Sequence, residues 1–89
     1  MPTTDTATAL LADKLRALTD LAAQLPTNPD DADMLDLVQL LRMIASTAES
    51  AQRQAVPLAV ANGDSWDRVG SVLGVTRQAV WERYGGGRT

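Results

Sequence analysis

The stretch "SWDRVGSVLGVTRQAVWERYG", residues 65–85, decides the fold of the C-terminal part of this chain. Either Asp64 or Ser65 can cap a helix over residues 66–73, because a side-chain oxygen there accepts a hydrogen bond from a free backbone N–H. Thr76 can cap a second helix over residues 77–84 in the same way. Two short helices this close together need a tight corner, which residues 73–75 supply.

The corner has the residues that such a turn needs. Gly74 lies where a tight turn favours a positive φ, which glycine adopts without a steric penalty. Gly70 is small and lies where the two helices are expected to cross closely. The residues expected to face inward are Val69, Leu73, Val75, Val80 and Tyr84, and Trp66 is expected to join the same core.

The patterns W-x-x-V-G, L-G-V-T and R-Q-A-V in this stretch resemble the helix-turn-helix units of small bacterial transcription regulators and of the DNA-reading C-terminal region of sigma factors. The resemblance covers about a quarter of the chain. It implies that the helix after the corner enters the major groove of DNA, with its N-terminal residues against the bases. Two departures are Arg83, at a position that is often apolar, and the acidic pair Asp64 and Asp67, which would repel phosphates.

The resemblance assigns roles to residues of the second helix. Thr76, Arg77 and Gln78 occupy its exposed start. Arg77 is suited to pair with O6 and N7 of guanine, and Gln78 with N6 and N7 of adenine; the alternative is that both are ordinary solvated helix surface. Trp81 shares their face and is expected either to touch DNA or to pack against the long helix or another chain. Contacts to the DNA backbone are expected from Ser65, Arg68, Thr76 and Arg83.

The rest of the chain favours helix as well. Alanine and leucine are abundant, and aromatic residues are only 3% of the chain, so local preference is helical nearly everywhere. The expected fold is all-α: a long N-terminal helical hairpin followed by a C-terminal helix-turn-helix. In the first helix, apolar residues recur at alternating spacings of four and three up to Pro26, which ends it. These residues are Leu11, Leu15, Leu18, Ala22 and Leu25.

The second long helix begins with a clear signal. Asn28 is a good N-cap, Pro29 fits the first helical position, and the two aspartates that follow favour the positive end of the helix dipole. Pro57 removes a backbone donor, so the helix is expected to kink or restart there. This divides the chain into a hairpin, residues 1–56, and a helix-turn-helix unit, residues 57–89. From Met34 onward, a heptad register passes through Met34, Leu37, Leu41, Ile44, Ala48, Ala51, Ala55 and Leu58.

Both long helices carry more apolar surface than one short hairpin can cover. One interpretation is a single intramolecular hairpin with some exposed leucines. The other, which we favour, is a homodimer in which two chains bury the surplus, because contiguous exposed apolar surface on a small monomer promotes aggregation. The residues expected in this dimer interface are Leu11, Leu18, Leu37, Leu40, Leu41 and Ile44.

The composition excludes several kinds of chemistry. The chain has no cysteine and no histidine, which removes disulfides, thiolate nucleophiles, imidazole bases and the usual zinc ligands. We therefore expect no enzyme activity, no metal and no cofactor. No window approaches the roughly 20 apolar residues of a membrane helix, and the N-terminus lacks a signal-peptide pattern. The expected protein is cytoplasmic and does not bind a membrane.

The net charge of −3 is unevenly distributed. Residues 1–51 hold three basic and eight acidic residues, whereas residues 52–89 hold five basic and three acidic ones. Contact with a polyanion such as double-stranded DNA is therefore expected in the C-terminal part. The predicted function is a small dimeric, sequence-specific DNA-binding transcriptional regulator. The alternative is a module of helix-turn-helix shape that binds a protein, as an adaptor or antagonist of the transcription machinery.

Overall fold

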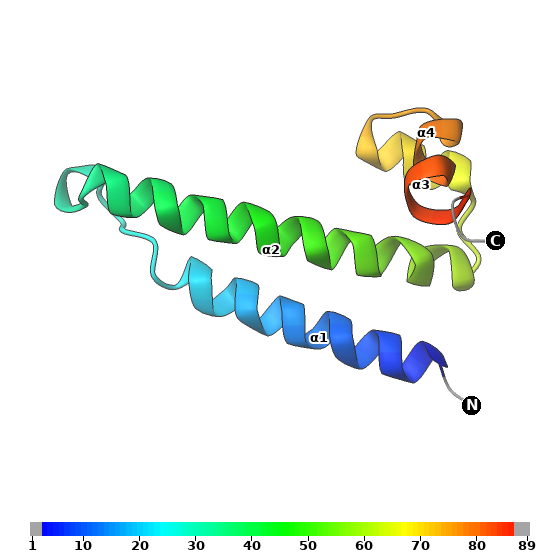
Figure 1. Ribbon diagram of the computed structural model, residues 1–89, viewed down its shortest axis with the longest axis horizontal. Coiled ribbons are helices and arrows are strands. Elements are labelled where there is room, and N and C mark those ends of the chain that lie inside the picture. The colour runs from blue at the N-terminus through cyan, green and yellow to red at the C-terminus, as the bar shows by residue number, and fades with distance from the viewer. Residues whose placement is uncertain (1–2, 87–89) are drawn as a thin grey trace.

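The computed structural model describes residues 3–86, and every regular element among them is helical (Figure 1). The all-α prediction is confirmed. None of these helices combines the length and the apolar character of a membrane span. The elements are α1 (Thr3–Ala22), the 3₁₀ turn η1 (Pro29–Asp31), α2 (Met34–Ala61), α3 (Trp66–Leu73), α4 (Arg77–Trp81) and the π-helical turn η2 (Glu82–Gly86).

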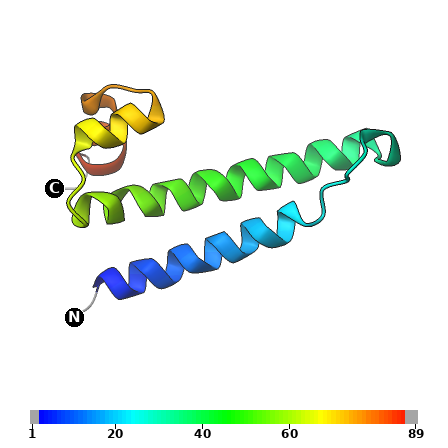
Figure 2. The same ribbon diagram turned by 180° about the vertical axis from the view of Figure 1, so that it is seen from behind.

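The longest element, α2, has α1, α3 and η2 packed against it, and α4 packs on α3 and η2. α1 runs antiparallel along one side of α2, and α3, α4 and η2 lie on the other side, at its C-terminal end (Figures 1 and 2). A helix of 28 residues is about 42 Å long, which accounts for most of the 47 Å length of the molecule. α2 thus has two neighbours on different faces: α1, and residues 66–86, which we name the C-terminal helix pair.

The start of α2 differs from the prediction. Asn28 does cap a helix, and its side chain accepts a hydrogen bond from the N–H of Asp30 at 3.0 Å, but that helix is the short η1 turn. α2 itself begins at Met34, where the Asp33 carboxylate accepts hydrogen bonds from two N–H groups of the first turn, at 2.9 and 3.2 Å. A carboxylate cap also interacts favourably with the helix dipole. The second of two consecutive cap signals therefore starts the long helix.

The seam between α1 and α2 is shifted from the predicted stripes. The buried or half-buried residues that follow four-three spacing along the hairpin are Ala7, Leu11, Lys14, Leu18 and Leu21 in α1, and Leu37, Leu40, Ile44, Thr47 and Ala51 in α2. The predicted stripe residues that are exposed instead are Leu15, Ala22, Leu25, Met34, Leu41 and Ala48. At alternate positions of each stripe, the residue in the seam is therefore the one before the predicted residue: Lys14 in place of Leu15, for example, and Leu40 in place of Leu41. Apolar residues on both sides of the seam made the two registers equally plausible from sequence.

α2 continues through Pro57, so of the two expected outcomes, a kink or a restart, the restart does not occur. Proline cannot donate a hydrogen bond to the carbonyl of Arg53, one turn earlier, but it lies at the exposed surface. The helix therefore crosses the expected boundary between residues 56 and 57. Val56 is only 6% exposed and belongs to the core of the C-terminal helix pair, so the two parts of the chain share a helix and a core.

One apolar cluster holds the C-terminal helix pair against α2. Its buried members are Val56 of α2, Val69 of α3, Val80 of α4 and Tyr84 of η2, with Val60, Trp66 and Leu73 packed around them. Gln52 Nε2 also donates a hydrogen bond to the Tyr84 hydroxyl at 2.9 Å. The inward positions predicted from sequence are confirmed except for Val75, which is 40% exposed.

Backbone geometry fixes the corner between α3 and α4. Gly74 has a φ of +75°, in the left-handed region that favours glycine. The N–H of Val75 donates a hydrogen bond to the carbonyl of Gly70 at 2.9 Å. A Cβ added at Gly70 would lie 2.8 Å from the Val75 carbonyl oxygen and 3.2 Å from the carbonyl group of Thr76. The predicted close approach at Gly70 is confirmed.

We predict that Gly70→Ala lowers the free energy of unfolding by about 1–3 kcal/mol, the range for overpacking. In an ordinary helix the same substitution would raise it by about 1 kcal/mol through helix propensity, so the sign of the change reports the close backbone approach. Urea unfolding followed by circular dichroism measures this change. Ser71→Ala, at the next and exposed position, is the control and should stay within about 0.5 kcal/mol of the parent. A Gly70→Ala protein as stable as the parent would contradict the prediction.

Candidate nucleic-acid interface

The start of α4 is defined by a helix cap. Thr76 Oγ1 accepts a hydrogen bond from the N–H of Ala79 at 3.1 Å, as predicted. The corner before it lies at the edge of the molecule farthest from α1 (Figure 1). The first turn of α4 therefore lies at an outer edge, where a large partner can approach it.

Arg77 and Gln78 are exposed on this first turn. Trp81, one turn later, is 48% exposed. The three side chains line one shallow hollow of the surface. Arg77 offers five N–H donors, Gln78 both donates and accepts, and Trp81 adds an apolar ring. The fold thus brings together three of the residues predicted from sequence, with chemistry suited to base edges and sugars.

Glu82 modifies this surface. Gln78 Nε2 donates a hydrogen bond to Glu82 Oε2 at 3.1 Å, across one helical turn. One amide proton of Gln78 is therefore engaged, and a carboxylate lies beside the exposed face of α4. A negative charge there opposes the approach of a phosphate. This role of Glu82 was not predicted from the sequence, although residues four apart on a helix are neighbours.

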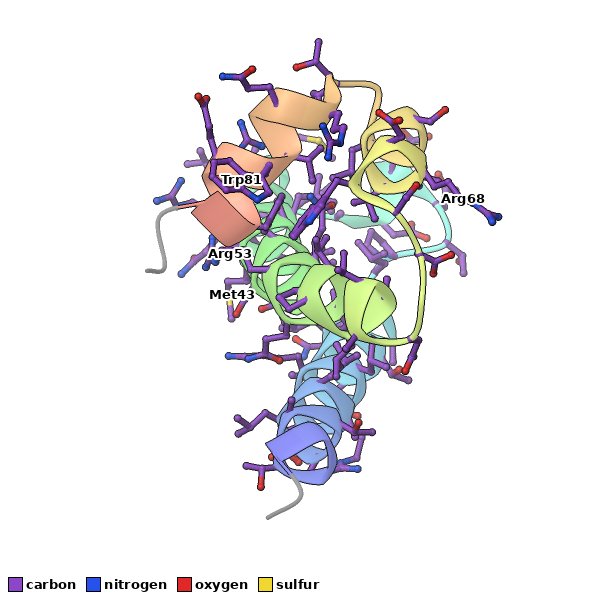
Figure 3. The ribbon with its side chains drawn as sticks, turned by 90° about the vertical axis from the view of Figure 1, so that its right-hand side faces the viewer. Met43, Arg53, Arg68 and Trp81 are labelled. Carbon is purple, nitrogen blue, oxygen red and sulfur yellow. The ribbon has the colours of Figure 1, made fainter. Side chains whose placement is uncertain are left out.

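The other predicted DNA-backbone contacts are dispersed. Ser65 Oγ caps α3 by accepting a hydrogen bond from the backbone N–H of Arg68 at 3.1 Å. The Arg68 side chain projects on the side of the C-terminal helix pair opposite to Trp81 (Figure 3). Arg83 is exposed on η2. A flat surface that includes Trp81 therefore does not include Arg68.

Arg53 of α2 is a basic residue with no role predicted from the sequence. It lies on the same side of the molecule as Trp81 (Figure 3). Its side chain is 57% exposed and its Nη1 lies 3.7 Å from Glu49 Oε1. The excess of basic residues after position 51 was the available signal, but the fold of α2 is needed to place Arg53 on this side.

The residues predicted for a dimer interface fall into two groups. Leu11, Leu18, Leu37, Leu40 and Ile44 are half-buried along the hairpin of the single chain. Leu41 is 47% exposed. Five of the six therefore contribute to packing between α1 and α2, and Leu41 lies on a different face.

Two further findings concern metal ions and similar proteins. Within residues 3–86, no three or more acidic side chains are grouped so that they could hold a metal ion. Comparison of the chain with family models, with curated proteins and with solved structures finds no match. Function is therefore inferred from the geometry of the chain's own residues.

We predict that Thr76→Ala loosens the first turn of α4, because the N–H of Ala79 loses its acceptor. A lost cap typically costs about 0.5–2 kcal/mol. Hydrogen exchange measured by NMR should become roughly tenfold faster at the Ala79 amide. Thr76→Ser keeps the hydroxyl and should exchange like the parent. Unchanged exchange at Ala79 in Thr76→Ala would show that this cap does not hold the turn.

Proposed function

We propose that the C-terminal helix pair is a helix-turn-helix unit and that the protein is a small dimeric DNA-binding transcriptional regulator. The observation that carries the proposal is the exposed pair Arg77 and Gln78 on the first turn of α4, beside the exposed ring of Trp81. In a helix-turn-helix, the second helix lies in the major groove with its N-terminal residues against the bases. Arginine and glutamine are the side chains that pair bidentately with guanine and adenine.

The rigid mounting of α4 supports this role. Base readout needs side chains held within about 0.5 Å of a productive geometry. Val80, on the inner side of α4, is 1% exposed. Gly74 and the Thr76 cap fix the chain before the helix. The exposed residues therefore project from a backbone that is held at both ends of the corner.

The charge balance favours two copies acting together. Residues 52–89 hold five basic and three acidic residues, and Glu82 lies beside the proposed reading surface. Electrostatic affinity for DNA scales with the number of phosphates neutralised, so one copy binds weakly. Two copies on adjacent half-sites double the number of phosphate and base contacts.

A second candidate is a protein-binding module, such as an adaptor or antagonist of the transcription machinery. The observation that favours it is apolar surface on the C-terminal helix pair, where Val72 is 85% and Val75 40% exposed. A protein interface buries such side chains at its centre. Salt separates the two candidates, because DNA binding weakens steeply as salt rises and an apolar interface responds little.

We predict that Arg77→Ala with Gln78→Ala weakens binding to a preferred duplex at least about 30-fold, since each bidentate base contact is worth roughly 1–3 kcal/mol. The duplex is first selected from a random pool, and its affinity is then measured by fluorescence anisotropy at fixed salt. The matched control is Arg16→Ala with Gln24→Ala, which removes the same two side-chain types from exposed positions in α1 and in the turn that follows it. Equal affinity of the α4 variant and the control would contradict the assignment of α4. A pool that yields no duplex at low salt would favour the protein-binding module.

We predict that Glu82→Gln strengthens duplex binding several-fold at low salt, because it removes a negative charge near the phosphates and keeps an acceptor for Gln78. The gain should shrink as salt rises, which anisotropy at two salt concentrations measures. Asp20→Asn, an equal change of charge on exposed α1, is the control and should leave affinity within about twofold of the parent. Weaker binding by Glu82→Gln would instead mean that Glu82 contacts the DNA or positions Gln78 for it.

A further inference from the structure

The chain exposes more surface than a folded monomer of its size. Its accessible surface is 6585 Å², whereas a monomer of 9.5 kDa is expected to expose roughly 5000 Å². The excess exceeds the ~800 Å² that each partner buries in a standard interface. Among the described residues, the hairpin contributes only Ala51 to the buried apolar core outside the C-terminal cluster. The hairpin is thus a single layer of helices with a further face to cover.

One uncovered face of α2 is a continuous apolar stripe. Met34, Val38 and Leu41 are 52%, 61% and 47% exposed. Ala45 and Ala48 are exposed as well and continue the same four-three spacing. We name these five residues the α2 stripe. By helical geometry it lies about one third of a turn around α2 from the residues of the α1 seam.

The α2 stripe ends where the C-terminal helix pair begins. At the same spacing, Gln52, Ala55 and Ala59 line a groove beneath α3 together with Val69 and Val72. Near the C-terminal end of α2, this face is therefore flanked by α3, with the groove between the two helices. Over the rest of its length, no described part of the chain covers it.

Two opposite charges flank the α2 stripe, and one of them, Glu49, also lies 3.7 Å from Arg53 of the same helix. Arg42 and Glu49 are seven residues apart, about two turns, and they line one shallow hollow together with Val38, Leu41 and Ala45. They therefore lie on the same edge of the stripe. A two-fold axis that relates two antiparallel copies of α2 brings this edge against itself, so Arg42 of each copy faces Glu49 of the other.

A parallel arrangement does not give this match. It brings the charged edge of one copy against the opposite edge of the second, where Leu37, Ile44 and Ala51 lie. Arg42 and Glu49 would then have no charged partner across the interface. The charge pattern of α2 is therefore self-complementary in the antiparallel direction alone.

We propose that two copies of this chain pair antiparallel through the α2 stripe, with Arg42 of each copy against Glu49 of the other. The apolar residues supply most of the affinity, and the ion pairs set direction and register. This interface uses only Leu41 of the residues predicted for dimerisation from sequence. The pairing deepens the proposed function, because it states how the two copies meet. Only the spacing of the two copies on DNA, described below, rests on that function.

The same register gives a neighbour to the two most exposed large apolar side chains of the described residues. Leu35 and Val72 are 80% and 85% exposed. Leu35 lies one heptad before Arg42, and Val56 lies one heptad after Glu49, so Leu35 of one copy lies level with Val56 of the other. Val56 and Val72 line the same groove, of about 400 Å³. The first turn of the second α2 is therefore level with this groove.

The pairing also sets the distance between the two C-terminal helix pairs. In this register the two copies of Val56 are about 32 Å apart along the helices, close to the roughly 34–36 Å between half-sites one turn apart on DNA. α1 and the C-terminal helix pair lie on opposite sides of α2 (Figure 3). The two-fold axis therefore leaves both helix pairs on one side of the dimer, where one duplex can reach both.

Charge exchange tests the register. The dissociation constant of the full chain is measured by sedimentation equilibrium for Arg42→Glu, for Glu49→Arg and for their double variant. Each single variant should dimerise at least about tenfold more weakly, because like charges then face each other twice. The double variant, and an equal mixture of the two single variants, should regain the parent affinity. Arg16→Glu, the same charge reversal on exposed α1, should change nothing.

A second pair of variants tests the apolar face. Leu41 and Met43 are both 47% exposed, but they lie about 160° apart around α2, and Met43 is on the side of Arg53 (Figure 3). Leu41→Asp should weaken dimerisation at least about 100-fold, while Met43→Asp should dimerise like the parent. Circular dichroism checks that both variants keep their helices. Equal effects of the two substitutions would overturn the proposal.

Three other outcomes also overturn the pairing: a parent chain that stays monomeric at about 1 mM, single charge reversals without effect, and a mixture of single variants that does not associate. The DNA proposal fails separately. A dimer with the expected charge response that selects no duplex would keep the pairing and remove the regulator. A monomer that selects a single half-site would keep the assignment of DNA binding and remove the pairing.

Discussion

One apolar cluster, which contains Val80 of α4 and Val56 of α2, joins the C-terminal helices to the rest of the molecule. Val80 is 1% exposed and Val56 6%, and Val69 and Tyr84 complete the cluster. α3 has eight residues and α4 five, lengths at which an isolated helix is not stable in water. Their shape therefore depends on an apolar surface that α2 supplies, and so does the position of the exposed residues on α4.

α2 has more than one apolar face because it is long and its side chains repeat every 3.6 residues. One face receives α1, a second receives the C-terminal helix pair over its last turns, and the α2 stripe continues that second face toward Met34. In a chain of 89 residues one core is marginal. Folding stability and self-association are therefore linked, since a second copy that binds only the folded chain stabilises it by mass action.

Local features were the part of the fold that sequence predicted best. The Thr76 and Ser65 caps, the positive φ of Gly74 and the close approach at Gly70 all follow from residues within a few positions of one another. Errors arose where two local solutions compete. Asn28 and Asp33 are both good caps, and the later one starts α2. Val75 was expected inside because it is apolar, but the corner turns it outward.

The sequence by itself determined which segments are helical, where the corner lies, and that Arg77 and Gln78 open the last helix, because caps, glycine dihedrals and helix periodicity depend on neighbours within about four residues. Only the tertiary structure decided that Leu40 rather than Leu41 faces α1, and that Arg68 and Trp81 project on opposite sides. Those choices depend on contacts between segments far apart in the chain. An apolar residue is equally able to pack against any of the neighbours that its helix could meet, so the pattern of one helix does not specify which neighbour takes which face.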